Sequence, residues 1–313
     1  MSATATATVY IPTLHGGENL RRCLEALRRQ TVPVQVVVAD NGEGDGSATM
    51  LSEGFAEVTR VGFGRNLGFG PALNRAIGEA GEGAIVLLND DAVAEPQLIE
   101  QLISGGAEAE MVAAVLLSER EPGTIDSAGV VVDQTLMAFD YLRGRPAGAA
   151  EAAAPPLGPT GGAALYSREA FEAVGGFDEN IFLYYEDVDL GLRMRAEGAR
   201  CALAPHARAV HGYSLTLGAR SGRKYAMTGW SRGYLMRRYG VTSRPSTALQ
   251  AVGREAAICA GQLLRDRTLA GARGRLVGWR AAKRLPSRQL PAGAITRLSM
   301  RRALGMRSAG HGA

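Results

Sequence analysis

The chain has 313 residues, of which 46% are apolar and 21% charged, as is ordinary for a water-soluble globular protein. No run of eighteen apolar residues occurs and the N-terminus lacks the features of a secretory signal, so neither a membrane-spanning helix nor a leader is expected. Residues 1–218 carry 15 Lys and Arg against 29 Asp and Glu, a difference of −14, whereas residues 219–313 carry 20 against 2, a difference of +18. This basic C-terminal part is typical either of binding to an anionic partner, a membrane surface or nucleic acid, or of a merely solvated tail.

Strands and helices are predicted to alternate over the first third of the chain. Short apolar runs predict buried strands at 8–12, 32–42 and 84–92. Apolar residues at helical spacing predict helices at 18–30, 66–80 and 95–106, and a turn-rich loop is expected at 41–48. This order predicts right-handed βαβ units and a parallel sheet, in which ligands bind beyond the carboxyl ends of the strands.

The pattern is less regular after about residue 107. Further strands are predicted at 111–118 and 201–211, and a small-residue run at 161–167 precedes a helix. The Gly/Ala/Pro-rich segment 144–159 is expected to be a mobile loop. Residues 224–240 look helical, with weakly ordered arginine-rich stretches after them. The scattered cysteines show no metal-type spacing and indicate a cytosolic protein with reduced thiols.

Acidic and amide side chains follow the first three predicted strands, at Pro12–Thr13, Asp40–Asn41 and Asn89–Asp90–Asp91. Two carboxylates at the end of a buried strand repel each other unless a cation lies between them, and Mg²⁺ or Mn²⁺ would take their oxygens while bridging to phosphates. The competing explanation is that Asp90 or Asp91 caps the next helix. Asp40 and Asn41 either contact a ribose or base or belong to a solvated turn.

Two other features admit both a functional and a structural explanation. The loop 65–70, RNLGFG, offers backbone amides near a helix start, where phosphate is favoured, but it is neither a Rossmann fingerprint nor a P-loop. His211 follows an apolar strand, where a histidine is more often structural than a metal ligand.

Residues 182–195, FLYYEDVDLGLRMR, place three acids at the start of a predicted helix. One apolar stripe is expected along this helix, and Asp189 and Arg193 are spaced for an i,i+4 pair on its exposed side. Glu186 and Asp187 either complement the helix dipole or supply a general base. Spacing alone does not choose between these roles.

Together these segments resemble the family 2 inverting glycosyltransferases, which have the GT-A fold, and within them a bacterial rhamnosyltransferase-like branch. The resemblance runs from about Thr8 to Tyr239, about three quarters of the chain, and is carried by VYIPTLHGGENLRRCLEALRRQ, VVVADNGEGDGS, RNLGFGPALNRAI, VLLNDDA, GGAALYSREAFEAVGGFDENIFLYYEDVDLGLRMRAEG and ALAPHARAVH. It implies a Rossmann-like, mostly parallel sheet flanked by helices. The implied catalytic domain spans 1–220, with a nucleotide-binding half to about 107 and an acceptor half from about 108, followed by a basic, mainly helical extension at 221–313.

The resemblance also assigns roles to residues. It implies donor contacts for Pro12, Thr13, Asp40, Asn41, Arg65, Asn66, Gly68, Asn89, Asp90, Gly161 and Gly162. It implies metal ligation by Asp91 and His211, and catalysis by Asp187 as the base with Glu186 beside it. In two places the chain departs from the family: His15 stands near a position where Asn is usual, and Glu43–Gly44 replaces a common Ser-Thr.

The implied activity is metal-assisted transfer of a sugar, with rhamnose favoured, from a dTDP-, UDP- or GDP-linked donor to a glycan or lipid-linked glycan, with inversion and the help of Mg²⁺ or Mn²⁺. A cytoplasmic protein, peripheral on the inner face of the cell membrane, is expected. Nucleic acid is disfavoured because the basic tail lacks interleaved aromatic residues. Since the acidic motif begins with Asn89, a non-catalytic nucleotide-sugar-binding module remains the alternative. A pyrophosphorylase is disfavoured because TLHGGENLRR matches its signature loop poorly.

Overall fold

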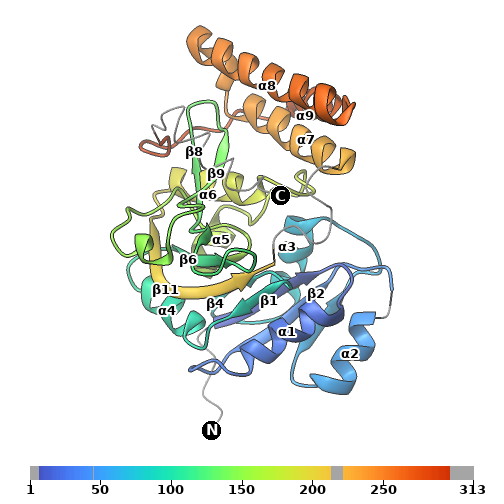
Figure 1. The fold of residues 1–313 in the computed structure, drawn as a ribbon, viewed down its shortest axis with the longest axis vertical. Helices are drawn as coiled ribbons and strands as arrows, with labels where there is room; N and C mark the ends of the chain where they lie inside the picture. The colour runs from blue at the N-terminus through green and yellow to red at the C-terminus, as the bar shows by residue number, and fades with distance from the viewer. Residues whose placement is uncertain (1–6, 45, 213–220, 297–313) are drawn as a thin grey trace.

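The computed structural model describes residues 7–44, 46–212 and 221–296 (Figure 1). It confirms the α/β class, because a large sheet lies between two layers of helices. All three cysteines are free. Among the described residues, no helix is both long and apolar enough to cross a membrane.

The strands of the large sheet follow one another across it in an order that differs from their order in the chain. They are β3 (Thr59–Gly62), β2 (Gln35–Asp40), β1 (Ala7–Thr13), β4 (Ala84–Leu88), β10 (Ala163–Tyr166), β6 (Met111–Ser118), β11 (Cys201–His211) and β5 (Ala92–Ala94), with β7 (Ile125–Ser127) beside β6. A separate two-stranded sheet pairs β8 (Val130–Val132) with β9 (Ala138–Asp140).

Half of this sheet is parallel, as the alternation of strands and helices predicts. β3, β2, β1 and β4 all run in one direction. β10 enters antiparallel between β4 and β6, and β5 pairs antiparallel with β11, so the sheet is mixed rather than mostly parallel. β10 belongs to the second half of the chain, where no strand–helix alternation was present to indicate its direction, and β5 is a three-residue strand directly after β4.

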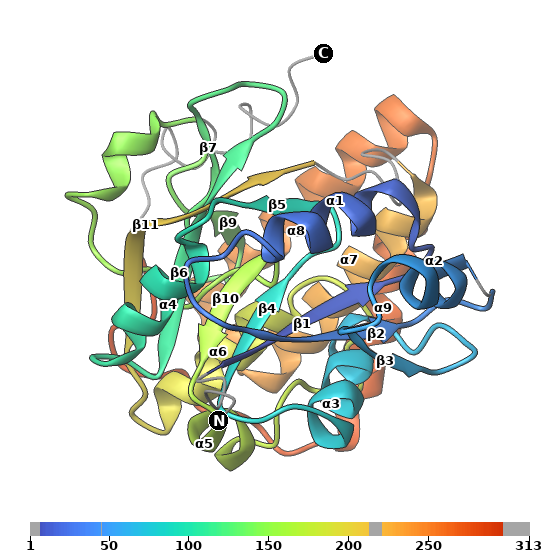
Figure 2. The same ribbon diagram turned by 90° about the horizontal axis from the view of Figure 1, so that it is seen from below.

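The helices cover both faces of the sheet (Figure 2). Apolar side chains of α1 (Gly17–Leu27), α2 (Gly46–Gly54) and α4 (Leu98–Gly106) share one core with the sheet. Those of α3 (Phe69–Glu79), α5 (Arg168–Ala173) and α6 (Glu186–Ala196) share the core on the opposite face. Each face therefore buries the apolar stripe of amphipathic helices, which is the main stabilising contribution of such a layered fold.

Two expectations about irregular segments were wrong. The segment 41–48 is not all loop, because α2 begins at Gly46. The arginine-rich part after residue 240 is helical over Pro245–Asp266 and Ala270–Ala281 instead of weakly ordered, and its last stretch, 297–313, lies outside the described residues. The segment 144–159 is mostly loop, as expected, with the short 3-10 helix η1 (Ala147–Ala150) and with Leu157 buried against β8.

The C-terminal helices stack at the end of the molecule opposite the N-terminus (Figure 1). They are α7 (Gly222–Arg238), α8 (Pro245–Asp266) and α9 (Ala270–Ala281). The 3-10 turn η2 (Val241–Ser243) joins α7 to α8, and a second, η3 (Ala282–Arg284), follows α9. The expected domain boundary after residue 220 borders residues 213–220, which lie outside the described residues.

Glycines allow α7 and α9 to pack backbone against backbone. A Cβ atom at Gly278 would lie 1.9 Å from the carbonyl oxygen of Trp230, and one at Gly233 would lie 2.0 Å from that of Arg275. Gly274 is equally tight, with 2.2 Å to the carbonyl oxygen of Ala226. No side chain larger than hydrogen fits at these positions without separating the helices.

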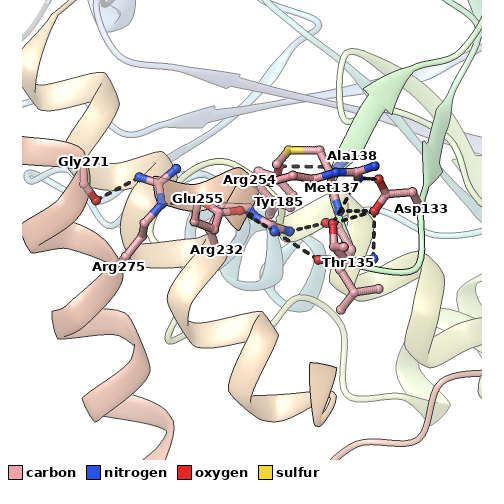
Figure 3. Close-up of polar contacts among 11 residues, drawn as sticks. Asp133, Thr135, Met137, Ala138, Tyr185, Arg232, Arg254, Glu255, Gly271 and Arg275 are labelled. Atoms are coloured by element: carbon pink, nitrogen blue, oxygen red, sulfur yellow. Dashed lines mark hydrogen bonds and ion pairs between the residues drawn. The ribbon is translucent and has the colours of Figure 1, made fainter. Parts of the chain in front are cut away.

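Buried ion pairs join all three C-terminal helices to the β8–β9 connection (Figure 3). Arg232 of α7, 1% exposed, donates to Glu255 of α8 at 2.6 and 2.9 Å, and Arg275 of α9 donates to the same carboxylate. Arg232 also donates to the Thr135 carbonyl at 3.0 Å. Burial alone would raise the pKa of Glu255, but the two guanidinium groups outweigh it and hold that pKa below its usual value. Glu255 is therefore charged and central to this packing.

The α7–α9 crossing makes the variant Gly278→Ala informative. The added methyl would collide with a backbone carbonyl, so we expect a loss of about 2–3 kcal/mol in the free energy of unfolding measured in urea. The matched control is Gly253→Ala on the exposed face of α8, where an added Cβ meets nothing within 4 Å among the described residues. That change should be neutral or should stabilise by up to about 1 kcal/mol. Equal effects of the two changes would contradict the packing described.

Candidate active site

A cleft of three adjoining cavities follows the carboxyl ends of the parallel strands. The first, about 420 Å³, shares Leu14, Asn66 and Arg223 with the second, of about 310 Å³. The second shares Phe69, Asn89, Leu183 and Tyr184 with the third, of about 410 Å³. This position is the one expected for a ligand site in an open α/β sheet.

The cleft brings together nearly all the residues that the sequence singled out. The second cavity is lined by Pro12, Thr13, Asn41, Asn66, Gly68, Asn89, Asp90, Asp91 and His211. Asp40 lines the first cavity, and Gly161, Gly162, Glu186 and Asp187 line the third. Arg65 is exposed and lies outside the lining of these three cavities as far as the described residues show.

Asp40, at the end of β2, fixes the floor of the first cavity. Its carboxylate is buried and accepts hydrogen bonds from the Ser47 hydroxyl, the Arg60 guanidinium at 2.8 Å and the Gly42 amide at 3.2 Å. With three donors already bound, Asp40 acts first as a support for the 40–47 loop. His15 and Glu43, which stand at the departures from the family pattern, line the same cavity.

The side-chain amides of Asn41 and Asn66 hold the glycine-rich loop before α3. Asn41 donates to the Gly68 carbonyl at 3.0 Å and to Asn66 at 3.0 Å, and it accepts from the Leu67 amide at 2.7 Å. Gly68 has φ 96°, and a Cβ there would lie 2.5 Å from the Phe182 carbonyl oxygen. The loop is thus fixed against the segment that leads into α6.

The acids after β4 meet His211 because β5 pairs antiparallel with the end of β11, placing His211 opposite Ala92. Nε2 of His211 lies 3.2 Å from Asp91 Oδ1, and Nδ1 lies 2.9 Å from Asp126 Oδ2. Burial alone would lower the pKa of His211, but its hydrogen bonds to Asp126 and Asp91 raise the pKa to about 10. Burial also raises the pKa of Asp90 to about 6, although the Thr13 hydroxyl, 2.6 Å away, opposes this.

The acid pair at the start of α6 faces the third cavity. Asp187 Oδ2 accepts from the Gly161 amide at 3.3 Å, and Oδ1 accepts from the Val188 amide at 2.8 Å. Burial raises the pKa of Asp187 above its usual value. Burial and the charge of Asp187 raise the pKa of Glu186, whose Oε2 has no hydrogen-bond partner among the described residues. Asp187 is therefore held in place, and its neighbour favours the neutral form.

Two tyrosines before this pair adopt an unusual backbone conformation. Tyr184 and Tyr185 both have φ 70°, in the left-handed region that bulky residues rarely occupy. Such strain persists where surrounding contacts fix it. Lys224 lies 5.6 Å from the Tyr184 ring centre. Arg232 lies 5.6 Å from that of Tyr185, and both residues are drawn in Figure 3. Helix α7 thus holds the turn that aims Glu186 and Asp187 into the cleft.

Sequence reasoning missed the part of the cleft that α7 supplies. Arg223 lines both the first and the second cavity, and Lys224 lines the third. Both lie in the first turn of α7, where the helix dipole disfavours positive charge. Two basic residues within three positions of the cap Ser221 were therefore a readable signal for an anion-binding role. Asp126 and its partner Arg143, 3.0 Å away, carried no such signal.

Asp189 forms the predicted pair with Arg193, at 2.7 Å, but not on an exposed side. The Asp189 side chain is 0% exposed, because α6 packs Leu190 and Met194 against the sheet and Val188 and Leu192 against the C-terminal helices. Arg288 and the Tyr239 hydroxyl, 2.9 Å away, also bind this carboxylate. The expected single apolar stripe is thus two stripes with a buried ion cluster beside them.

Comparison with known proteins links the chain to one family. Residues 8–175 match the family model described as Glycosyl transferase family 2. An N-acetylglucosaminyl-diphospho-decaprenol L-rhamnosyltransferase of Mycobacterium tuberculosis is 30% identical over 239 residues, covering 66% of this chain and 76% of the relative. Succinoglycan biosynthesis protein ExoA of Rhizobium meliloti is 29% identical over 210 residues, covering 63% of this chain and 60% of the relative.

Solved structures share the fold at low sequence identity. The mannosyltransferase PcManGT of Pyrobaculum calidifontis, in complex with GDP-Man and Mn²⁺, superposes with a TM-score of 0.54 and 16% identity, over 99% of this chain and 81% of its own. GalNAc-T7 with UDP, GalNAc and Mn²⁺ gives a TM-score of 0.59 and 14% identity, over 79% of this chain and 52% of its own. These likenesses identify the sheet and its helices as a GT-A fold.

The variant Asp189→Asn tests how the acid pair is held. It removes the buried negative charge between two partly buried arginines, so we expect a loss of about 3–5 kcal/mol in the free energy of unfolding in urea. The matched control is Glu79→Gln, which breaks the i,i+4 pair Arg75–Glu79 of the same 2.7 Å separation on an exposed surface. That change should cost less than about 0.5 kcal/mol. Similar losses in both variants would contradict the claim that burial makes the Asp189 ion pairs more important than an exposed pair.

Proposed function

The chain belongs to glycosyltransferase family 2, and from that premise we propose that it transfers a sugar from a nucleotide diphosphate sugar to an acceptor hydroxyl with inversion. The protein is a glycosyltransferase; the donor, the stereochemistry and the roles of single residues are the proposal. The observation that carries it is the cleft itself, which places Asp187 and the Asp91–His211 pair along one continuous surface. The relatives give no support to a pyrophosphorylase or a non-catalytic module.

The residues after β4 fit a divalent cation. Two neighbouring ligands of one octahedral cation lie about 3 Å apart, and Asp91 Oδ1 and His211 Nε2 are separated by 3.2 Å. Among the described residues, no group of three or more His, Cys, Asp or Glu side chains converges on one point. We propose that Asp91 and His211, once His211 has lost its Nε2 proton, would hold Mg²⁺ or Mn²⁺, and that the cation would supply positive charge to stabilise the leaving diphosphate.

Asp126 would position this site. Its carboxylate accepts the hydrogen bond from Nδ1 of His211, which leaves Nε2 directed at Asp91. A carboxylate behind a histidine ligand fixes the ring orientation and tautomer. Arg143 forms an ion pair with Asp126 at 3.0 Å and so fixes the carboxylate that orients His211.

In the proposed reaction Asp187 accepts the proton of the acceptor hydroxyl. The freed oxygen forms a bond to the anomeric carbon from the face opposite the diphosphate, while the bond from that carbon to the diphosphate oxygen breaks. The electron pair leaves with the nucleotide diphosphate, beside Arg223. Asp91 and Asp187 act at different points of one cleft, so charge on the leaving group and deprotonation of the acceptor are handled separately.

The sugar and the acceptor are proposed from similarity to a relative. The Mycobacterium tuberculosis relative is named as acting on a decaprenol-linked substrate with L-rhamnose, so we propose rhamnose and a lipid-linked glycan acceptor in cell-surface glycan synthesis. Such an acceptor is consistent with a cytoplasmic enzyme, peripheral on the membrane. The first cavity would take the nucleoside beside Asp40, and the third would take the acceptor beside Tyr184 and Tyr185.

The variant Asp187→Asn tests the proposed base. It keeps the size of the side chain but cannot accept the proton, so kcat should fall roughly 10²–10⁴-fold while the protein folds and binds nucleotide as before. The matched control, Glu197→Gln, lies just after the same helix on an exposed surface and should leave kcat unchanged. Turnover close to that of the unaltered protein would remove Asp187 from the role.

The same base should shape the pH profile. A general base must be unprotonated, and burial raises the pKa of Asp187. The value of kcat/KM should therefore rise with pH along a limb whose apparent pKa lies above the usual aspartate value of about 4. An acid limb at or below that value would contradict burial of the carboxyl.

Metal and donor binding should be linked. UDP, dTDP or GDP should raise the melting temperature in the presence of Mn²⁺, by up to the equivalent of about 2.7 kcal/mol at a hundredfold excess over Kd, for the nucleotide that fits. EDTA should remove most of that increase, as should Asp91→Asn. The control Glu79→Gln should behave like the unaltered protein. A nucleotide-dependent increase that is unchanged by EDTA and by Asp91→Asn would refute the proposed metal site.

A further inference from the structure

Helix α8 presents an apolar face that nothing in the described chain covers. Leu264 is 82% exposed, Leu249 78% and Val252 57%. Along α8 the exposed positions from Leu249 to Leu264 follow helical spacing. They are Leu249, Gln250, Val252, Gly253, Ala256, Ala257, Ala260, Leu263 and Leu264, and none of them is charged. An exposed apolar stripe of this length on a soluble protein marks an interaction surface.

Exposed basic side chains lie at the end of this stripe and on the helices that follow it. Arg265 and Arg267 lie at the C-terminal end of α8, and Arg273, Arg280 and Arg284 follow on α9 and η3, all exposed. On α9 the exposed Leu276 and Val277 stand in the sequence between Arg273 and Arg280. The acids of residues 219–313 are two, Glu255 and Asp266, and Glu255 is buried by its two arginines. The exposed surface of α8, α9 and η3 therefore combines apolar side chains with a strong excess of positive charge.

We propose that α8 and α9 form a docking surface for an anionic lipid bilayer, with α8 lying in the plane of the interface. Apolar side chains on one face and Lys or Arg around it are what an interfacial helix needs, since the former enter the acyl boundary and the latter attract anionic headgroups. A second copy of the chain fits less well, because pairing two such surfaces would bring the exposed arginines of the two copies together.

The position of the surface suits the cleft. α7, whose first turn lines all three cavities, packs directly against α9 at the same end of the molecule (Figure 1). A bilayer on α8 would hold the third cavity near the headgroups. Docking on a bilayer would bring the enzyme to its lipid-linked acceptor, and this purpose rests on the proposed function. The surface itself is tested without donor or acceptor.

The test is flotation of the full chain with vesicles of phosphatidylcholine alone or with about one anionic phosphatidylglycerol in three. The unaltered protein should bind the anionic vesicles at low salt and lose binding as the ionic strength rises. The triple variant Leu249→Glu, Leu263→Glu, Leu264→Glu should lose at least about tenfold in affinity. Its far-ultraviolet circular dichroism and melting temperature should not change, since these side chains are exposed.

A second variant separates charge at the docking surface from net charge. Arg265→Gln, Arg280→Gln and Arg284→Gln together should weaken binding to anionic vesicles. Arg22→Gln, Arg29→Gln and Arg75→Gln remove the same charge from exposed sites on the sheet-bearing body and should not weaken it.

Three outcomes would overturn the proposal. They are failure of the unaltered protein to bind anionic vesicles at low salt, equal binding by the leucine variant, and a dimer in light scattering that only the leucine variant abolishes. A protein that binds vesicles but shows no transfer would instead count against the proposed function alone.

Discussion

The buried carboxylate of Asp189 is the interaction on which the position of the acid pair depends. It lies one turn into α6, and its two oxygens are shared among Arg193 of the same helix, Tyr239 after α7, and Arg288 near the end of the described chain. A buried carboxylate with several charged donors is stable only when all of them are in place. The cleft therefore needs the C-terminal segments, even though most cleft residues come from the sheet.

The same dependence appears at the turn before α6. Tyr184 and Tyr185 adopt left-handed backbone conformations that cost free energy unless neighbouring groups fix them. Lys224 and Arg232 of α7 lie against their rings, and Arg232 is itself held by Glu255 of α8. The charge asymmetry of the chain thus has two structural origins: some arginines are buried partners of acids, and others remain on the surface.

Sequence patterns predicted β1, β2 and β4 of the parallel half of the sheet, because local periodicity there carries the alternation of strands and helices, but they did not predict β3. The roles of Asp91 and Asp187 came from the family resemblance, because the residue pattern alone also allowed a helix cap at the first and a partner of the helix dipole at the second. Sequence patterns could not predict Asp126, which lies 85 residues from His211 in the chain and reaches it because β7 and β11 both pair with β6. Nor could they predict that Asp189 is buried, because the second apolar stripe of α6, Leu190 and Met194, is visible only when the helix is seen between two layers.

The arrangement also explains how one basic segment can serve two surfaces. Glycines at 229, 233, 274 and 278 bring α7 and α9 into backbone contact, which directs the first turn of α7 into the cleft and leaves the outer side of α9 exposed. α8 attaches through Arg254 and Glu255 on its inner side, so the opposite side remains apolar and uncovered by the described chain. Because the inner contacts are ionic and the outer face is apolar, the helices hold the acid pair and present a lipid-facing surface at the same time.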